Sequence, residues 1–214
     1  MQWSLALLLA GLLVLASPAR TFPLKLPPVD DCRSTPGLTA FRNRLTEVVA
    51  RKDSKALIAM LADDVLINFG GEDGPRAFAE TWALSESGKS DLWPLLTKML
   101  KLGCARSGKK FAIPSLTMQF EPDADEDLFD IFVVVAPNAA LRSGSAAGSP
   151  VIARLAWDVV KAIDQSGGAQ TKIELQDGRQ GWIDAEQLYN PASYRLFMEQ
   201  RGGKWMITAL VAGD

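Results

Sequence analysis

The chain has 214 residues, 48% of them hydrophobic, which is enough to form one large domain or two small ones around a packed core. It carries 23 Lys and Arg against 25 Asp and Glu, so it lacks the basic excess with which proteins neutralise a nucleic-acid backbone. Histidine is absent, which removes the commonest general base and the commonest metal ligand. We therefore expect no nucleic-acid partner, no metal or other cofactor, and no enzymatic activity.

The N-terminus has the composition of a secretory signal peptide. Residues 1–19 carry no charged side chain, and an apolar run from Leu5 to Ala16 ends in small residues before Arg20. We predict a signal peptide over 1–19 and a periplasmic or secreted protein with no stable membrane span after its removal. An uncleaved membrane anchor is the alternative, but the run is short for a span.

The two cysteines, Cys32 and Cys104, both follow this segment. An even count in an exported protein indicates a disulfide, which on the chain-entropy model stabilises the fold by about 4 kcal/mol. A catalytic thiol is the alternative, and without histidine no obvious base would activate it.

Residues 32–120 are predicted to form a mostly helical α+β region with four helices and one strand. The helix starts are marked by capping residues or first-turn prolines: Thr35-Pro36, Asp53 or Ser54, Gly74-Pro75 and Ser90. In the first helix apolar residues recur with the helical period: Leu38, Phe41, Leu45, Val48 and Val49. Between the second and third helices, Val65 to Phe69 alternates like a strand.

The second half has the pattern of a small β-barrel. Runs of β-branched residues, such as 131–135, alternate with turn residues at intervals of about ten residues. We predict a barrel over 131–191 and a C-terminal hairpin over 192–214 that packs back on the rest, which makes the fold class α+β.

Three motifs within 131–191 resemble the bacterial SH3 domain family (SH3b). ALRSGS at 140–145 and SPVIARL at 149–155 are similar to its opening loop and following strand. The most specific motif is LQDGRQGWI at 175–183, in which Asp177-Gly178 would form a tight turn and Trp182 would pack the barrel. Ala169 and Ser145 depart from the usual Trp and Pro of the family. The resemblance implies an SH3-like barrel that binds cell-wall fragments or envelope proteins.

The flanking segments have a weaker resemblance to nuclear-transport-factor-like, cone-shaped α+β domains. Residues 48–82 are similar to the opening of such a domain, with two helices running into a strand, and residues 194–208 to its closing hairpin. The barrel would then interrupt this domain. Whether the two flanks form one domain stays open at this point.

Aromatic and basic residues of the predicted barrel are the candidate ligand-binding residues. Trp182 lies where the family buries a core tryptophan, so Trp157 is the better candidate for contacting a sugar or peptide. The candidates are Trp157, Arg142, Arg179 and Tyr189. The sequence thus favours an exported, non-catalytic binding protein of the bacterial cell envelope.

A different hypothesis places the function in the N-terminal α+β region. Asp63 and Asp64 would act as an acid–base pair in a small-molecule-binding or enzymatic pocket, since burial can raise the pKa of a carboxyl group. A ligand-sized cavity beside these two residues would favour this alternative.

Overall fold

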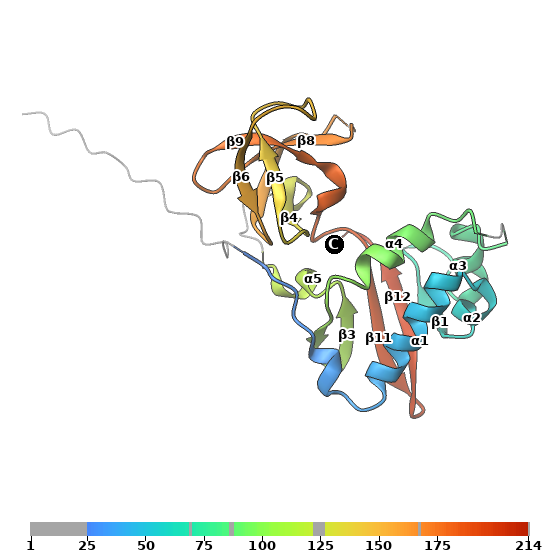
Figure 1. Ribbon diagram of the computed structural model, residues 1–214. Coiled ribbons are helices and arrows are strands. Elements are labelled where there is room, and N and C mark those ends of the chain that lie inside the picture. The colour runs from blue at the N-terminus through green and yellow to red at the C-terminus, as the bar shows by residue number, and fades with distance from the viewer. Residues whose placement is uncertain (1–24, 69, 86–87, 122–126, 167, 214) are drawn as a thin grey trace, which may run out of the picture.

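The computed structural model describes residues 25–213 apart from 69, 86–87, 122–126 and 167. The predicted signal peptide, 1–19, lies outside the described residues. The protein has a mixed α+β architecture with two sheets, one of which is covered by helices (Figure 1). In the described ranges, no helix is long and apolar enough to cross a membrane.

The first sheet has five strands in the order β1-β12-β11-β3-β2. β1 and β12 pair in parallel and the other neighbours are antiparallel. The bounds are β1 (Leu61–Leu66), β2 (Ala105–Ser107), β3 (Lys110–Ile113), β11 (Arg195–Arg201) and β12 (Lys204–Val211). The predicted C-terminal hairpin therefore lies inside a sheet whose other strands come from residues 61–113.

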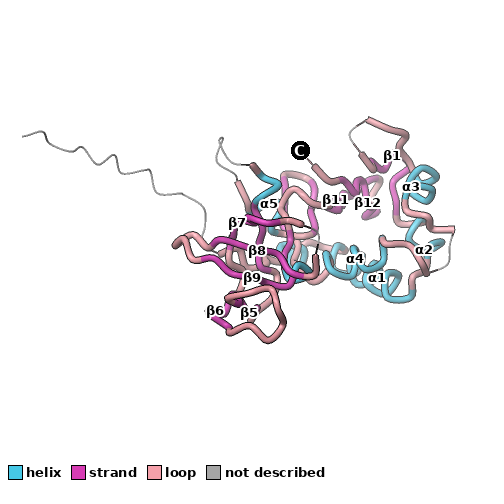
Figure 2. The backbone as a smooth tube through the Cα atoms, turned by 90° about the horizontal axis from the view of Figure 1, so that it is seen from above, coloured by secondary structure: helices cyan, strands magenta, loops and turns pink. Residues whose placement is uncertain are grey.

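In the described residues between 31 and 119, five α-helices and a short 3-10 helix accompany this sheet. They are η1 (Asp31–Ser34), α1 (Leu38–Arg51), α2 (Ser54–Ile58), α3 (Pro75–Thr81), α4 (Leu92–Met99) and α5 (Leu116–Gln119). We call them, with the five-stranded sheet, the helical lobe. Viewed from above, α1 to α4 gather at one end of the molecule (Figure 2).

The local signals for helix starts were mostly correct. The Asp53 side chain caps α2 by accepting a hydrogen bond from the Ala56 N–H (2.9 Å), and Pro75 opens α3 after Gly74. The start of α1 at Thr35-Pro36 was wrong, because Gly37 has a φ of 74° and the helix begins only at Leu38. A left-handed residue cannot continue a right-handed helix, so the preceding residues form a turn instead.

The predicted strand at 65–69 is displaced toward the N-terminus. The strand observed is β1, and it is set by parallel pairing with β12, in which Leu61 lies opposite Ile207 and Leu66 opposite Ala209. Asp63 and Asp64 therefore lie within a strand and not at a helix-to-strand junction.

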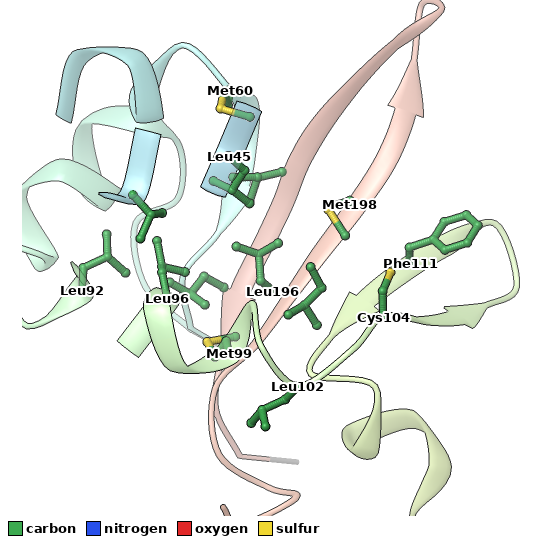
Figure 3. Packing of buried hydrophobic residues seen from close by; sticks show 14 of the residues in the cluster. Leu45, Met60, Leu92, Leu96, Met99, Leu102, Cys104, Phe111, Leu196 and Met198 are labelled. Carbon is green, nitrogen blue, oxygen red and sulfur yellow. The ribbon is translucent and has the colours of Figure 1, made fainter. Parts of the chain in front are cut away.

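The main hydrophobic core lies between the helices and the five-stranded sheet. Figure 3 shows Leu45 of α1, Leu96 of α4 and Leu196 of β11 gathered between the helices and that strand. All three are at most 2% exposed, so each contributes nearly its full side-chain area to the core.

The second sheet has seven antiparallel strands in the order β10-β4-β7-β8-β9-β5-β6. Their bounds are β4 (Ile131–Val134), β5 (Ala139–Arg142), β6 (Val151–Leu155), β7 (Val159–Asp164), β8 (Gln170–Glu174), β9 (Gln180–Asp184) and β10 (Leu188–Tyr189). Among the described residues no pairing joins β10 to β6, so the sheet is not the closed barrel that the sequence predicted. Two 3-10 helices, η2 (Leu128–Asp130) and η3 (Ala185–Gln187), accompany this sheet, and together they form the second lobe.

The two lobes share buried surface. Ile131, Val133, Val159 and Tyr189 of the second lobe belong to the same buried cluster as the helices and the five-stranded sheet. A separate smaller cluster, which includes Val134, Leu141 and Ile173, fills the second lobe itself. The lobes are therefore held together by apolar contact and not only by the chain.

The segment 25–31, which we call the strap, touches both lobes. The Leu26 N–H donates to the Trp157 carbonyl in the second lobe (2.8 Å), and the Cys104 N–H of the helical lobe donates to the carbonyl of Val29 (2.8 Å). Directly after the strap, Cys32 forms a disulfide with Cys104, with Cα atoms 5.8 Å apart. The predicted pairing of the two cysteines is confirmed.

Candidate functional site

A large cavity lies between the two lobes. It has a volume of about 900 Å³ and is bounded by the ends of α1 and α4 on one side and by the segments around Val135 and Gln187 on the other. α4 lies on the side of the helical lobe that faces the second lobe (Figure 1). We call this cavity the interlobe cleft.

The sequence of α4 explains how one wall of the cleft forms. Leu92, Leu96 and Met99 follow the helical period and point into the main core, where all three are at most 1% exposed. The opposite face of the helix and the turn after it line the cleft with Pro94, Thr97, Lys98 and Lys101. One amphipathic helix thus supplies both core packing and a polar wall.

The cleft is rich in positive charge. Four lysines line it, whereas Asp91 and Glu186 are the acidic residues of its lining. The lysines are Lys52, Lys89, Lys98 and Lys101. The whole chain has a formal net charge of −2, so this positive surface runs against the overall charge of the protein.

Lys98 is the lysine whose environment is most unusual. Its side chain is half-buried, its Nζ donates to the Leu188 carbonyl across the cleft (2.9 Å), and its Nζ lies 5.7 Å from the centre of the Tyr189 ring. Burial lowers the pKa of the Lys98 ammonium, and the negative charge of Glu186 opposes this shift. Lys98 therefore carries a partly desolvated charge at the wall of the cleft.

Tyr189 was predicted to bind ligand, but the structure buries it, and it does not line the cleft. Its side chain belongs to the main core, the residue is 4% exposed, and its hydroxyl donates to the Tyr194 carbonyl (2.5 Å). Burial raises the pKa of this hydroxyl. Tyr189 thus presents its buried ring to the Lys98 ammonium.

Trp157, the preferred aromatic candidate, lies at the joint between the strap and the lobes. It is half-buried and packs against the main core, and its backbone has a φ of 62°. Its N–H donates to the Val134 carbonyl (3.0 Å), while its carbonyl accepts from Leu26. These contacts give Trp157 a role in packing the lobes together.

Trp182 was predicted to pack in the core of the barrel, but it lies on the outer face of the second lobe. Strand alternation buries its neighbours Gly181 and Ile183, and leaves Trp182 half-buried opposite Arg142 on β5 and Lys172 on β8. A Cβ at Gly181 would come within 2.7 Å of the Arg142 carbonyl oxygen, so β5 and β9 pack too closely there for a side chain. Trp157 packs against the main core, whereas Trp182 lies on the face of β9 opposite its buried residues.

The two predicted arginines lie apart from the cleft. The Arg142 Nη1 donates to the Ser149 carbonyl (2.9 Å), which holds the loop between β5 and β6. Arg179 forms an ion pair with Asp177 in the β8–β9 turn (2.8 Å) and lines a smaller cavity of about 260 Å³. Of the four predicted ligand-binding residues, none lines the interlobe cleft.

Asp63 and Asp64 do not form the acid–base pocket of the alternative hypothesis. Both side chains are exposed on β1, and Asp64 forms an ion pair with Arg201. Neither lines a cavity described above. In the described ranges, no group of three or more Cys, Asp or Glu side chains is arranged to hold a metal ion.

No protein-family model and no curated protein matches this sequence. Among solved structures, the chain is similar to an NTF2-like protein of unknown function from Shewanella oneidensis, with 10% identity over 83% of this chain and 96% of that one and a TM-score of 0.32. It is also similar to an NTF2-like protein of unknown function from Pseudomonas putida, with 10% identity over 82% of each chain and a TM-score of 0.28. A third structure, Rd1NTF2_05, has 10% identity over 82% of this chain and 96% of that one, with a TM-score of 0.27. The neighbours thus carry the name of the family that the flanking segments resemble, and they assign no function.

Proposed function

We propose that this chain is an exported, non-catalytic binding protein of the bacterial cell envelope, whose ligand occupies the interlobe cleft. The ligand would be a cell-wall fragment or a segment of an envelope protein. The observation that carries the proposal is the cleft itself, because its volume of about 900 Å³ falls within the range of ligand sites and both lobes contribute to its lining.

Binding is favoured over catalysis by the side chains that the chain has. The sequence contains no histidine, and both of its cysteines form the disulfide, so neither imidazole nor thiol chemistry is at hand in the cleft. The disulfide also supports export, because such bonds persist in oxidising compartments.

We further propose that the second lobe is an SH3-like domain. The support comes from the hairpin motif of the family, in which β8 and β9 pair around a turn at Asp177-Gly178 with a φ of 84° at the glycine. Gly181 then permits the close approach of β9 to β5. The turn matches the role that the resemblance assigns to Asp177-Gly178.

A small-molecule ligand is the second candidate, and it would use the same cleft, since helices of the N-terminal region form one of its walls. In this form of the alternative we propose α4 as the wall of the pocket, because α4 lines the cleft whereas Asp63 and Asp64 are exposed on β1. A separate surface, formed by Trp182 with Arg142 and Lys172 opposite it, is the competing place for a wall ligand.

Cosedimentation with purified insoluble cell wall tests the proposal. Thr97 is exposed on the cleft wall, so Thr97→Trp would place a bulky indole in the cleft. Thr46→Trp is the matched control, because Thr46 is also exposed on a helix and its hydroxyl makes the same bond to the carbonyl four residues earlier, but it does not line the cleft.

We expect the wild type and Thr46→Trp to sediment with the wall and Thr97→Trp to stay in solution while folded. Sedimentation of Thr97→Trp at the wild-type level would show that the cleft is not the wall-binding site. If Trp182→Ala alone abolished sedimentation, the site would be the outer face of the second lobe. If neither the wild type nor any variant sedimented, wall binding would be refuted.

A further inference from the structure

We propose that the interlobe cleft selects ligands that carry an acidic group, a carboxylate or a phosphate, and that Lys98 is the residue that contacts this group. The inference rests on the proposed function in one respect, since it takes the cleft as the ligand site. It adds the chemical class of the ligand and the residue that determines it.

The lining of the cleft carries more positive than negative charge. Four ammonium groups against two carboxylates leave the cleft with a positive excess of two charges on a protein of net charge −2. Such an excess inside a concave, partly desolvated surface concentrates anions and repels cations. Cationic ligands are therefore disfavoured at this site.

The Lys98 ammonium has more hydrogen-bond donors than the acceptor that the protein supplies. An ammonium group has three N–H donors, and the Leu188 carbonyl accepts one of them. The described part of the chain offers Lys98 no carboxylate in ion-pair contact, and Glu186 acts on it only at longer range. Removing a charged group from water costs free energy unless the charge is paired. An acidic group of a ligand would offset this desolvation cost at Lys98, because no carboxylate of the described residues does so by direct contact.

Lys98 is held in position by its contacts with the second lobe. Its Nζ is bound to the carbonyl of Leu188 on β10, and the Tyr189 ring lies against it. Tyr189 is itself fixed by burial and by its hydrogen bond to Tyr194. A cation that is already ordered loses little conformational entropy when it binds an anion.

The other lysines of the lining would act by long-range attraction and not by direct contact with the ligand. Lys52, Lys89 and Lys101 are exposed, so their charges are solvated and screened. They would attract an anion toward the cleft, and the contact that depends least on salt would be the one with Lys98.

The test measures binding of small probes to the full chain by titration calorimetry. Glutarate and glutaramide form a matched pair, because the diamide keeps the size of the diacid and lacks its charge. Pyrophosphate is the phosphate probe, and a comparison of its affinity with that of glutarate separates the two sources of the acidic group.

Lys98→Met removes the charge and keeps an apolar side chain of similar length, and Lys98→Arg restores the charge. Lys204→Met is the control, since Lys204 is an exposed lysine of β12 that does not line the cleft. We expect glutarate or pyrophosphate to bind the wild type, and Lys98→Met to weaken that binding by about tenfold. Lys98→Arg and Lys204→Met are expected to bind like the wild type.

The inference is overturned if neither anion binds, if glutaramide binds as well as glutarate, or if Lys98→Met binds unchanged. Thermal unfolding of each variant establishes that it is folded. Failure of this inference can be distinguished from failure of the proposed function. If Thr97→Trp blocks wall sedimentation and Lys98→Met does not, the cleft binds the wall through an uncharged group. The proposed function would then stand, and the inference about Lys98 would be wrong.

Discussion

Lys25 and Asp158 are 133 positions apart in the sequence, yet the Lys25 Nζ lies 2.9 Å from Oδ2 of Asp158. The same carboxylate oxygen accepts the Ala156 N–H (2.6 Å), and Lys25 also donates to the Ala156 carbonyl (2.8 Å). This small network attaches the strap to the second lobe beside Trp157. The strap thus reaches the helical lobe through Cys104 and the second lobe through Asp158.

The first prediction is that Lys25 and Asp158 contribute unequally to the free energy of unfolding. Asp158→Ala is expected to lower the free energy of unfolding by about 1–2 kcal/mol, because the Ala156 N–H loses its acceptor. Lys25→Met is expected to cost less than about 0.5 kcal/mol, since the Lys25 side chain is 55% exposed and its ion pair is solvated. Urea unfolding of the two variants measures both values, and an equal loss in both would contradict this assignment.

The second prediction compares the two tryptophans. Trp157→Ala is expected to destabilise the protein by about 2–3 kcal/mol, because Trp157 packs against the main core. Trp182→Ala is expected to cost about 1 kcal/mol or less, since the residue lies on the outer face between Arg142 and Lys172. Chemical denaturation gives the two values. The reverse order would place Trp182 in the core, as the resemblance to the SH3 family first implied.

The third prediction concerns the disulfide. Cys32 and Cys104 are 72 residues apart, and on the chain-entropy model the bond stabilises the folded state by about 4 kcal/mol. Both residues are fully buried, so alanine is the suitable replacement at both positions. Serine at either position would bury a hydroxyl that has no partner. The unfolding midpoint of the double alanine variant in urea is expected to fall strongly, and to match that of the wild type under reducing conditions. A wild-type midpoint unchanged by reductant would show that the bond contributes little.

The fourth prediction is a pH dependence. Arg42 donates to both carboxylate oxygens of Asp30, one bond measuring 2.8 Å, and this lowers the pKa of Asp30 below its ordinary value of 3.8. The unfolded state therefore binds the proton more readily. The contribution of the ion pair between Asp30 and Arg42 to stability is complete above the pKa of Asp30 in the unfolded state. It is lost as the pH falls through the lower pKa of Asp30 in the folded state.

Arg42→Gln is therefore expected to destabilise the protein by about 1 kcal/mol at neutral pH, with a difference from the wild type that shrinks in acid. Urea unfolding of both proteins at neutral pH and near pH 3 measures the two differences. Arg33 also contacts Asp30, but its side chain is 79% exposed, so Arg33→Gln is a control expected to have a smaller effect. A loss in Arg42→Gln that is constant with pH would show that the pair acts through packing alone.

Much of the local structure was predictable because its causes lie within a few residues of the sequence. The N-cap at Asp53, the helix start at Gly74-Pro75 and the turn at Asp177-Gly178 are each determined by backbone preferences or by a single side-chain hydrogen bond. The disulfide was predictable for a different reason, since two cysteines allow one pairing. The start of α1 was missed because the left-handed conformation of Gly37 outweighed the preference of Thr35-Pro36 for a helix start.

The sequence by itself determined the α+β composition, the disulfide and the amphipathic pattern that places Lys98 opposite the buried face of α4. Only the tertiary structure decided that Lys98 meets Leu188, 90 positions away, across a cleft between two lobes. It also decided which tryptophan faces outward, because the close approach of β5 to β9 at Gly181 sets the alternation there. Periodicity reports which side of an element is polar, but the partner that this side faces depends on how distant segments pack, and no local pattern carries that information.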